Sequence, residues 1–160
     1  MKTHITRIFI VEDDMFCNKM LTMYLSSKNI GEIQSFYSGE ECLTQLFKRP
    51  EIVLLDFDLP GRDGVSTLKE IKLRSPESIV IFLSGQTDVK VAIEAIRSGA
   101  YDYIVKDEHA NETALNKIDQ IRRLQKAESK NTIRKRSNLI LLLIVVLSWT
   151  AFVIYALMEK

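Results

Sequence analysis

Two cysteines among 160 residues are too few for a disulfide framework. Cys17 and Cys42 lie in helix-like segments and lack the spacing of a metal site, so a reduced, cytosolic compartment is the simpler interpretation. A strong net charge is also absent. The formal charge is +1, which by itself argues neither for nor against nucleic acid as a partner. The length allows one domain with a real core and little more.

The charges are distributed unevenly along the chain. Residues 1–118 carry 14 Lys and Arg against 18 Asp and Glu, a net charge of −4. Residues 119–138 carry 7 against 2, a net charge of +5. An acidic domain is therefore followed by a basic segment. We interpret that segment first as the flank of a membrane span, second as a contact for anionic lipid and only third as a nucleic-acid contact.

The chain has one long hydrophobic run, residues 139–157, which contains no charged residue. A helix of this length covers roughly 28 Å, close to the ~30 Å hydrocarbon core of a bilayer. A buried core helix is the alternative, but we expect a transmembrane helix, preceded by a basic juxtamembrane linker (125–138) and followed by a short non-cytoplasmic tail (158–160). Because positive charge accumulates on the cytoplasmic side, residues 1–124 should face the cytoplasm.

Residues 1–124 alternate between the periodicities of strands and helices. Continuous apolar runs, typical of buried parallel strands, occur at 8–11, 52–55, 79–83 and 103–105, with a weaker strand at 32–36. Helices are predicted between them, including 39–48, 64–74 and 111–124. Two helical stripes are predicted to face the core: Cys17, Met20, Leu21, Tyr24 and Leu25, and then Val89, Ala92, Ile93 and Ile96. Five βα units imply an α/β fold, in which helices cover both faces of a parallel sheet.

Polar residues follow these strands at their carboxyl ends, where α/β proteins bind ligands. They are Glu12, Asp13 and Asp14 after the first strand, Asp56 and Asp58 after the third, Ser84 and Gly85 after the fourth, and Lys106 after the fifth. An apolar strand does not readily carry a charge into the interior, so we expect Asp56 to stand exposed at the rim.

The acidic residues of this rim suit a metal ion and a covalent reaction. Like charges on Glu12, Asp13 and Asp56 raise pKa values or demand a cation, and Mg²⁺ prefers such oxygen ligands. A carboxylate such as Asp56 can act as a nucleophile and form an aspartyl phosphate. The metal, Lys106 and donors near Ser84 can neutralise the charge of the transferred group.

Over roughly residues 5–124, the sequence resembles the response-regulator receiver domain of two-component signalling. Five motifs occur in that family's order: Phe9–Asp14, Leu55–Gly64, Phe82–Gly85, Ser98–Tyr103 and Lys106. The resemblance implies a flavodoxin-like, doubly wound five-stranded sheet of order 2-1-3-4-5. It implies Mg²⁺ as the cofactor and a histidine kinase or phosphotransfer protein as the phosphoryl donor.

The resemblance also implies a role for each matching residue. Asp56 is the phosphoacceptor, and Asp13 is a direct Mg²⁺ ligand. The other implied roles are Mg²⁺ binding largely through water for Glu12, Mg²⁺ binding by the backbone carbonyl for Asp58, phosphate binding for Lys106, and switching for Ser84 and Tyr103.

Each of these residues has an ordinary structural explanation when it is taken alone. Ser84 can be a turn hydroxyl, Lys106 a solvated amine and Tyr103 a core aromatic. Asp13 and Asp14 can be helix caps, and Asp14 is the residue expected to start the helix. Their occurrence together at one rim favours function, although the two interpretations of Tyr103 are about equal. The family usually has proline after the lysine, often with a cis bond. Here Asp107 follows, so this loop is either trans and differently shaped or strained.

We expect a membrane-tethered, single-domain response regulator at a bacterial inner membrane, with no enzyme activity of its own. It would signal by docking an unidentified downstream protein or would drain phosphate from a kinase, with no nucleic-acid partner. A docking adaptor that works without phosphorylation is one alternative, because Asp107 replaces the usual proline. A haloacid-dehalogenase-type phosphatase is another, since Asp56-Phe57-Asp58, Ser84 and Lys106 resemble its motifs. However, the acidic pair precedes the nucleophile, and about 120 residues leave no room for a substrate cap.

Overall fold

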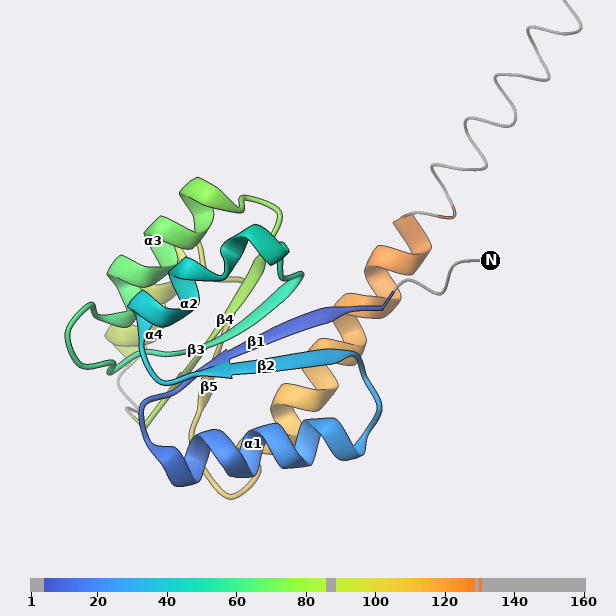
Figure 1. Ribbon diagram of the computed structural model, residues 1–160, viewed down its shortest axis with the longest axis horizontal. Helices are drawn as coiled ribbons and strands as arrows, with labels where there is room; N and C mark the ends of the chain where they lie inside the picture. Colours follow the sequence, from blue (N-terminus) through green and yellow to red (C-terminus); the bar gives the residue numbers. More distant parts are fainter. Residues whose placement is uncertain (1–4, 86–88, 129, 131–160) are drawn as a thin grey trace, which may run out of the picture. The chain divides into compact units, whose positions relative to one another are not determined.

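The computed structural model describes residues 5–85, 89–128 and 130 (Figure 1). The chain divides into two compact units, Met1–Asp119 and Gln120–Lys160. The predicted transmembrane helix over 139–157, the tail over 158–160 and most of the predicted linker lie outside the described residues. Within the described ranges, no helix combines the length and hydropathy that a bilayer crossing needs.

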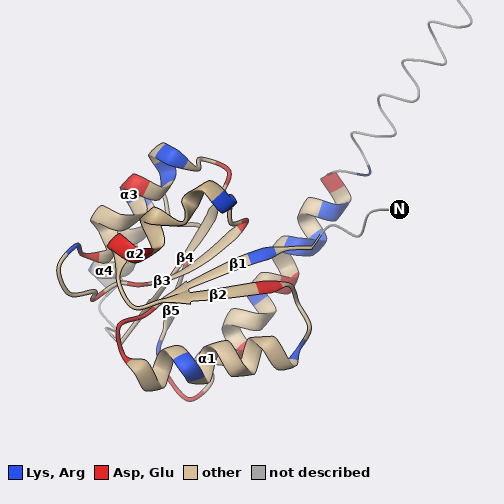
Figure 2. Cartoon of the chain, viewed as in Figure 1, with Lys and Arg blue, Asp and Glu red and all other residues tan. Residues whose placement is uncertain are grey.

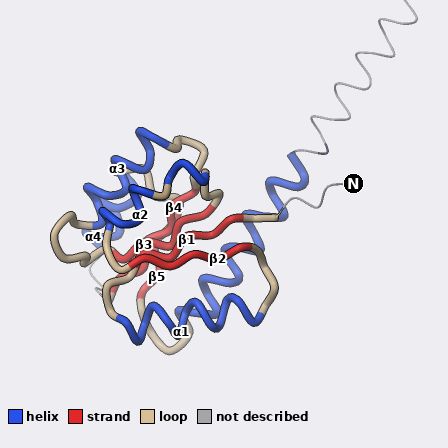
Figure 3. The backbone as a smooth tube through the Cα atoms, viewed as in Figure 1, coloured by secondary structure: helices blue, strands red, loops and turns tan. Residues whose placement is uncertain are grey.

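Strands and helices alternate along the first unit (Figure 3). The strands are β1 (Arg7–Val11), β2 (Glu32–Phe36), β3 (Ile52–Asp56), β4 (Ile79–Ser84) and β5 (Asp102–Val105). The helices are α1 (Met15–Ser27), α2 (Gly39–Thr44), the 3₁₀ turn η1 (Leu46–Lys48), α3 (Gly64–Arg74), α4 (Val89–Arg97) and a C-terminal helix over 110–128. All strands are parallel, in the order β2-β1-β3-β4-β5. This arrangement confirms the predicted flavodoxin-like fold.

The three central strands are buried on both sides. Every residue of β3 is buried, and only the first residue of β1 and of β4 is not. Figure 1 shows α1 on one face of the sheet and α2 and α3 on the other. Because helices cover both faces, the interiors of these three strands are continuous apolar runs and do not alternate between apolar and polar residues.

The core face of α1 differs from the predicted one. Met20 is 46% exposed and Cys17 is also exposed, whereas Asn18 is 1% exposed. Asn18 Nδ2 donates hydrogen bonds of 2.9 Å to the backbone carbonyl oxygens of Glu12 and Phe36. These bonds satisfy a buried amide, which hydrophobic periodicity cannot anticipate. The predicted core residues of this helix that are buried are Leu21 and Leu25.

The predicted core face of α4 is also partly wrong. Ile93 and Ile96 are 46% and 47% exposed, and Ala95 is buried in their place. Ala95 belongs to the main core cluster, so α4 packs through a small side chain. The side chain of Val89 lies outside the described residues. The longer apolar side chains of α4 therefore remain at the surface.

The helix predicted over 39–48 is divided in two. Gln45 leaves the helical conformation, with φ −102° and ψ 2°, and separates α2 from η1. Arg49 then adopts a left-handed conformation with φ 53° and ends η1. The predicted boundaries of α3 are confirmed, because Pro76 cannot continue the helix beyond Ser75. Gly99 takes a left-handed conformation after α4, with φ 102°.

Gly64 allows α3 to begin directly against the end of β3. A Cβ atom at this position would meet the carbonyl oxygen of Asp56 and lie 2.8 Å from that of Phe57. We expect Gly64→Ala to lower the free energy of unfolding by about 1–3 kcal/mol, measured by urea denaturation. Gly85→Ala is the matched control, because a Cβ there meets nothing within 4 Å. Equal effects of the two substitutions would contradict this explanation.

Candidate functional site

The sheet ladder places the predicted site residues at a common rim. Each of three strands is extended by a backbone hydrogen bond to its neighbour: Glu12 N donates to Phe36 O at 3.0 Å, Phe57 N to Leu83 O at 2.9 Å, and Lys106 N to Ser84 O at 2.7 Å. The chain is therefore still held by the sheet where the polar residues begin. The sheet therefore fixes the backbone positions from which these side chains project.

Lys106 joins two buried carboxylates at this rim. Its Nζ lies 2.8 Å from Asp56 Oδ2 and 2.7 Å from Glu12 Oε2. Asp56 is only 4% exposed, so the prediction that it stands exposed was wrong. The prediction treated the carboxylate as an unpaired charge, whereas the ammonium group of Lys106 compensates it inside the fold. The other oxygen, Asp56 Oδ1, accepts a hydrogen bond of 3.2 Å from Asp58 N.

Burial controls how the groups of this rim ionise. Desolvation and the nearby Asp56 charge outweigh the hydrogen bond and ion pair with Lys106, and they raise the pKa of Glu12 to about 7. Burial alone would lower the pKa of Lys106. Its hydrogen bonds and ion pairs with Asp56 and Glu12 outweigh this effect and raise that pKa. Lys106 therefore stays charged at neutral pH, whereas Glu12 titrates there.

Three carboxylates of the rim could hold a metal ion. Oxygen atoms of Glu12, Asp13 and Asp56 all lie within 4.8 Å of one another. Two of these residues are buried, and Asp13 is exposed and opens the cluster to solvent. The set contains only hard oxygen donors and carries more negative charge than Lys106 offsets. Such a set fits Mg²⁺.

Two further aspartates at this end of the sheet are helix caps. Asp14 accepts a hydrogen bond of 2.8 Å from Cys17 N at the start of α1, which confirms the interpretation of Asp14 as a helix start. Asp63 accepts one of 2.6 Å from Ser66 N at the start of α3. These bonds lower the pKa of both caps. Asp14 thus caps the helix that follows β1, and Asp63 caps the helix that follows β3.

Comparison with known proteins agrees with this geometry. Residues 8–119 match the family described as the response regulator receiver domain. The match covers more than half of the chain. The chain belongs to this family. Receiver domains bind Mg²⁺ at an acidic pocket, and Glu12, Asp13 and Asp56 form such a cluster here. Receiver domains are phosphorylated by histidine kinases or phosphotransfer proteins.

Individual relatives show the same similarity. The chain is 35% identical over 134 residues to the regulatory protein AtoC of Escherichia coli K12, covering 82% of this chain and 28% of AtoC. It is 32% identical over 130 residues to a protein-glutamate methylesterase/protein-glutamine glutaminase of Clostridium acetobutylicum, covering 79% of this chain and 38% of that protein. The chain thus spans about a third of these relatives. The BeF₃-activated receiver domain of Thermotoga maritima DrrB is 27% identical, with a TM-score of 0.67 over 73% of this chain and 97% of the other.

The predicted switch residues of the receiver lie on the two strands beside β3. Ser84 is fully buried at the end of β4, and its carbonyl oxygen accepts the bond from Lys106 N. Tyr103 on β5 is half-buried and packs against the main core cluster. Phe82 and Tyr103 are register partners between the two strands. These positions are compatible with a switching role for Ser84 and Tyr103, and that role stays a prediction. Metal binding by the backbone carbonyl of Asp58 also stays a prediction.

Asp107, where the family usually has proline, begins the turn that leads into the C-terminal helix. The described residues contain no cis peptide bond, so the trans form of this loop is the one observed. Asp107 N donates to Val105 O at 3.0 Å, and its Oδ1 accepts from His109 N at 2.9 Å. The carboxylate thus orders the turn directly after Lys106. Lys106 reaches Asp56 and Glu12 without a proline at the next position.

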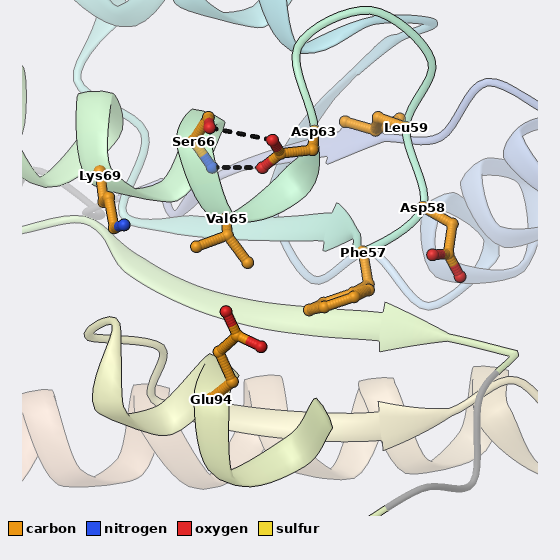
Figure 4. Close-up of a pocket in the computed structure, with 8 residues that line it drawn as sticks. All are labelled: Phe57, Asp58, Leu59, Asp63, Val65, Ser66, Lys69 and Glu94. Atoms are coloured by element: carbon orange, nitrogen blue, oxygen red, sulfur yellow. Dashed lines mark hydrogen bonds between the residues drawn. The ribbon is translucent and has the colours of Figure 1, made fainter. Parts of the chain in front are cut away.

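A cleft of about 560 Å³ lies beside the site (Figure 4). Phe57 and Val65 form an apolar part of its lining, and Lys69 of α3 faces Glu94 of α4 across it. Phe57 and Asp58 are the lining residues nearest to Asp56 in the sequence. The lining includes Asp58 but not Asp56, and Glu12, Asp13, Ser84 and Lys106 are absent from it too. The cleft and the reactive rim are therefore neighbours and not one site.

Sequence reasoning missed Asn18 as a supporting residue of the site. Its amide holds the backbone of Glu12 and of Phe36, so it fixes the loop that carries the acidic pair. The sequence contained one signal, since Asn18 lies three and seven residues before the buried Leu21 and Leu25. A polar residue on the buried face of a helix needs a partner, and here the partner is the site loop.

Proposed function

We propose that this receiver accepts a phosphoryl group on Asp56 from a histidine kinase or phosphotransfer protein and signals at a membrane by docking a downstream protein. One observation carries the phosphoacceptor assignment. Lys106 lies within 2.8 Å of Asp56 and contacts Glu12, beside a third carboxylate. This arrangement places a nucleophile, a fixed positive charge and a set of metal ligands at one rim.

The chemistry follows from this arrangement. A carboxylate oxygen of Asp56 attacks the phosphorus atom of a phosphohistidine, an O–P bond forms, and the P–N bond breaks with its electron pair on the imidazole nitrogen. Lys106 offsets negative charge on the transferred group, and Asp58 N and Lys106 fix the orientation of the Asp56 carboxylate. When bound by Glu12, Asp13 and Asp56, Mg²⁺ supplies further positive charge to the phosphoryl oxygens.

The phosphoacceptor assignment is tested by labelling with a small phosphodonor and Mg²⁺. We expect the wild-type chain to incorporate phosphoryl label and Asp56→Asn to incorporate essentially none, because an amide oxygen is a poor nucleophile. Asp63→Asn is the matched control, since Asp63 is an exposed aspartate at the same end of the sheet and caps α3. Equal label in Asp56→Asn and wild type, or loss of label in Asp63→Asn alone, contradicts the assignment.

Family membership argues against the phosphatase alternative. Residues 8–119 match the response regulator receiver domain, and the acidic pair precedes Asp56 in the sequence. The enzymatic relative also matches over only 38% of its own length. Receiver domains are typically non-enzymatic. Turnover of a phosphate ester by the wild-type chain and not by Asp56→Asn would restore the phosphatase.

Residues 139–157 support the membrane part of the proposal. They contain no charged residue and follow Arg134-Lys135-Arg136. The basic flank supports a position of the receiver on the cytoplasmic side of a bacterial inner membrane. We expect the full chain to resist alkaline extraction from membranes and the fragment 1–138 to be released. Extraction of both chains to the same extent would contradict the tether.

Docking is favoured over service as a phosphate sink by the surface of α4. This helix directly follows the strand that ends in Ser84, and it exposes Ile93 and Ile96. Apolar side chains at the surface of a switch element are available to a protein partner. A phosphate sink needs no such surface.

A further inference from the structure

The helical segments that precede β3 and β4 carry the most exposed large apolar side chains of the described residues. Leu73 is 78% exposed at the end of α3, and Phe47 is 74% exposed in η1. Lys48 and Arg49 follow Phe47, and Arg49 is exposed in its left-handed conformation. These four residues form what we call the amino-pole patch, because the strands of the parallel sheet begin at this end. The reactive rim lies at the opposite end.

A buried hydrogen-bond network holds the two halves of the patch together. Ser78 Oγ donates a hydrogen bond of 2.6 Å to the carbonyl oxygen of Pro50, the residue after Arg49. The same Oγ lies 2.8 Å from the Oγ of Ser75, which is two residues after Leu73. Lys72 Nζ donates to Ser78 O at 2.6 Å. The network joins the segment after η1 to the segment after α3. Phe47 and Leu73 therefore project from neighbouring, ordered segments.

The positive charges of the patch are not neutralised by the fold. Arg7 pairs with Glu32 at 3.2 Å, and Arg74 pairs with Glu70 at 2.6 Å. In contrast, neither Lys48 nor Arg49 takes part in an ion pair in the described part of the chain. Lys48 donates to the amide of Gln34 at 3.1 Å. The patch thus offers two apolar side chains flanked by two uncompensated cations.

The opposite end of the domain has the reverse charge. Asp13, Asp14, Asp107 and Glu108 are exposed in the loops that follow β1 and β5. Figure 2 shows acidic segments in these loops and basic segments at the ends of η1 and α3. An anionic surface therefore attracts the amino-pole patch and repels the rim. This charge distribution favours one orientation of the domain on an anionic surface, with the amino-pole patch toward that surface.

We propose that the amino-pole patch docks on the surface of an anionic lipid bilayer, with Phe47 and Leu73 in the headgroup region and Lys48 and Arg49 against lipid phosphates. This inference rests on the proposed membrane tether for its biological setting. Interfacial contacts combine apolar side chains with Lys and Arg in this way. Docking turns the reactive rim toward the cytoplasm, where a kinase reaches it.

Chain topology brings the last residues of the first unit to the end of the domain that carries the patch. The C-terminal helix begins at residue 110, after β5 has ended at the rim. By residue 119 it covers about 15 Å, close to the ~17 Å length of a five-residue strand. The first unit therefore ends near the starts of the strands. A tether that continues from this end raises the effective concentration of lipid at the patch, so a weak contact is enough.

The fragment 1–130 tests the patch without the hydrophobic run. It contains the complete sheet and its core, and the DrrB receiver domain of similar extent has been solved alone. We expect it to sediment with vesicles of phosphatidylglycerol and phosphatidylcholine and to bind pure phosphatidylcholine at least about tenfold more weakly. Phe47→Ser/Leu73→Ser and Lys48→Glu/Arg49→Glu should each weaken binding to the anionic vesicles by about tenfold or more.

A matched control is available on α1. Phe16 and Met23 are 72% and 69% exposed, so Phe16→Ser/Met23→Ser removes a similar apolar surface from another face. This control should change binding by less than about twofold. The inference is overturned if wild-type 1–130 does not bind the anionic vesicles. It is also overturned if the two serine pairs have equal effects, or if Phe47→Ser/Leu73→Ser binds like wild type, because binding would then be electrostatic only.

A tryptophan reporter shows insertion directly. The only tryptophan of the chain is Trp149, so the fragment 1–130 has none. Phe47→Trp fluorescence should shift to shorter wavelength with anionic vesicles and be quenched by brominated lipid, whereas Phe16→Trp fluorescence should not. A shift and quenching for Phe16→Trp but not for Phe47→Trp overturns the inference.

The tether and the patch can fail independently. If the full chain is extracted from membranes while 1–130 binds vesicles through the patch, the tether fails and this inference stands. If the full chain is retained in membranes and 1–130 does not bind vesicles, the tether stands and this inference fails.

Discussion

At about pH 8 and without Mg²⁺, the Glu12→Gln variant should unfold at a higher urea concentration than the wild-type chain. Burial raises the pKa of Glu12 from 4.5 to about 7. Below pH 4.5 the group is protonated in both the folded and the unfolded chain. Above that pH the unfolded chain loses the proton first, so the folded state becomes progressively less stable until about pH 7.

Glutamine removes this loss of stability because it is neutral at every pH. The gain in the free energy of unfolding at pH 8 should reach at most about 3 kcal/mol and should vanish near pH 4.5. The same variant should bind Mg²⁺ about 10–100-fold more weakly, measured by calorimetry, because Glu12 supports the metal ligands. Glu94→Gln, at an exposed carboxylate, is the control and should change neither property. A gain of stability that does not depend on pH would contradict this explanation.

Lys106→Met should have the opposite effect on stability. The substitution leaves the buried carboxylates of Asp56 and Glu12 without their shared ammonium group. Removing one partner of a buried ion pair typically lowers the free energy of unfolding by about 3–5 kcal/mol. We expect about 3 kcal/mol at pH 8 in urea denaturation without Mg²⁺, because the Lys106 side chain is 26% exposed and water lessens the loss.

The pH dependence of Lys106→Met distinguishes its charge from its packing. The raised pKa of Lys106 keeps the wild-type ammonium charged from pH 5 to pH 8, so its own titration does not change stability in this range. Glu12 takes up a proton as the pH falls below about 7 and lessens the repulsion. The loss should therefore be smaller at pH 5 than at pH 8. Lys69→Met, at an exposed lysine, is the control, and an equal loss in both variants would exclude the charge explanation.

Much of the site was predictable because parallel strands place their carboxyl ends at one edge. The positions of Glu12, Asp56, Ser84 and Lys106 after separate apolar runs were sufficient to bring them together. Helix boundaries followed from local signals. Asp14 caps α1, and Gly99 has the positive φ that the end of α4 requires.

Side-chain burial on the helices was less predictable. Met20 and Ile93 had the correct periodicity for the core and proved exposed, whereas Asn18 proved buried. Periodicity records which residues share a face and not which face meets the sheet. The acceptors that stabilise Asn18 are carbonyl oxygens from two distant loops, so only the tertiary structure decides its burial.

The sequence by itself determined the order of βα units, the family and the residues of the rim, because strands, caps and motifs are local patterns. Only the tertiary structure decided that Asp56 is buried, because Lys106 compensates it from a strand that is distant in sequence. It also decided that Phe47 and Leu73 stand on neighbouring segments, since the hydrogen bond from Ser78 to Pro50 joins residues that are 28 positions apart. Charge compensation and surface neighbourhood depend on three-dimensional distance, which a linear pattern does not contain.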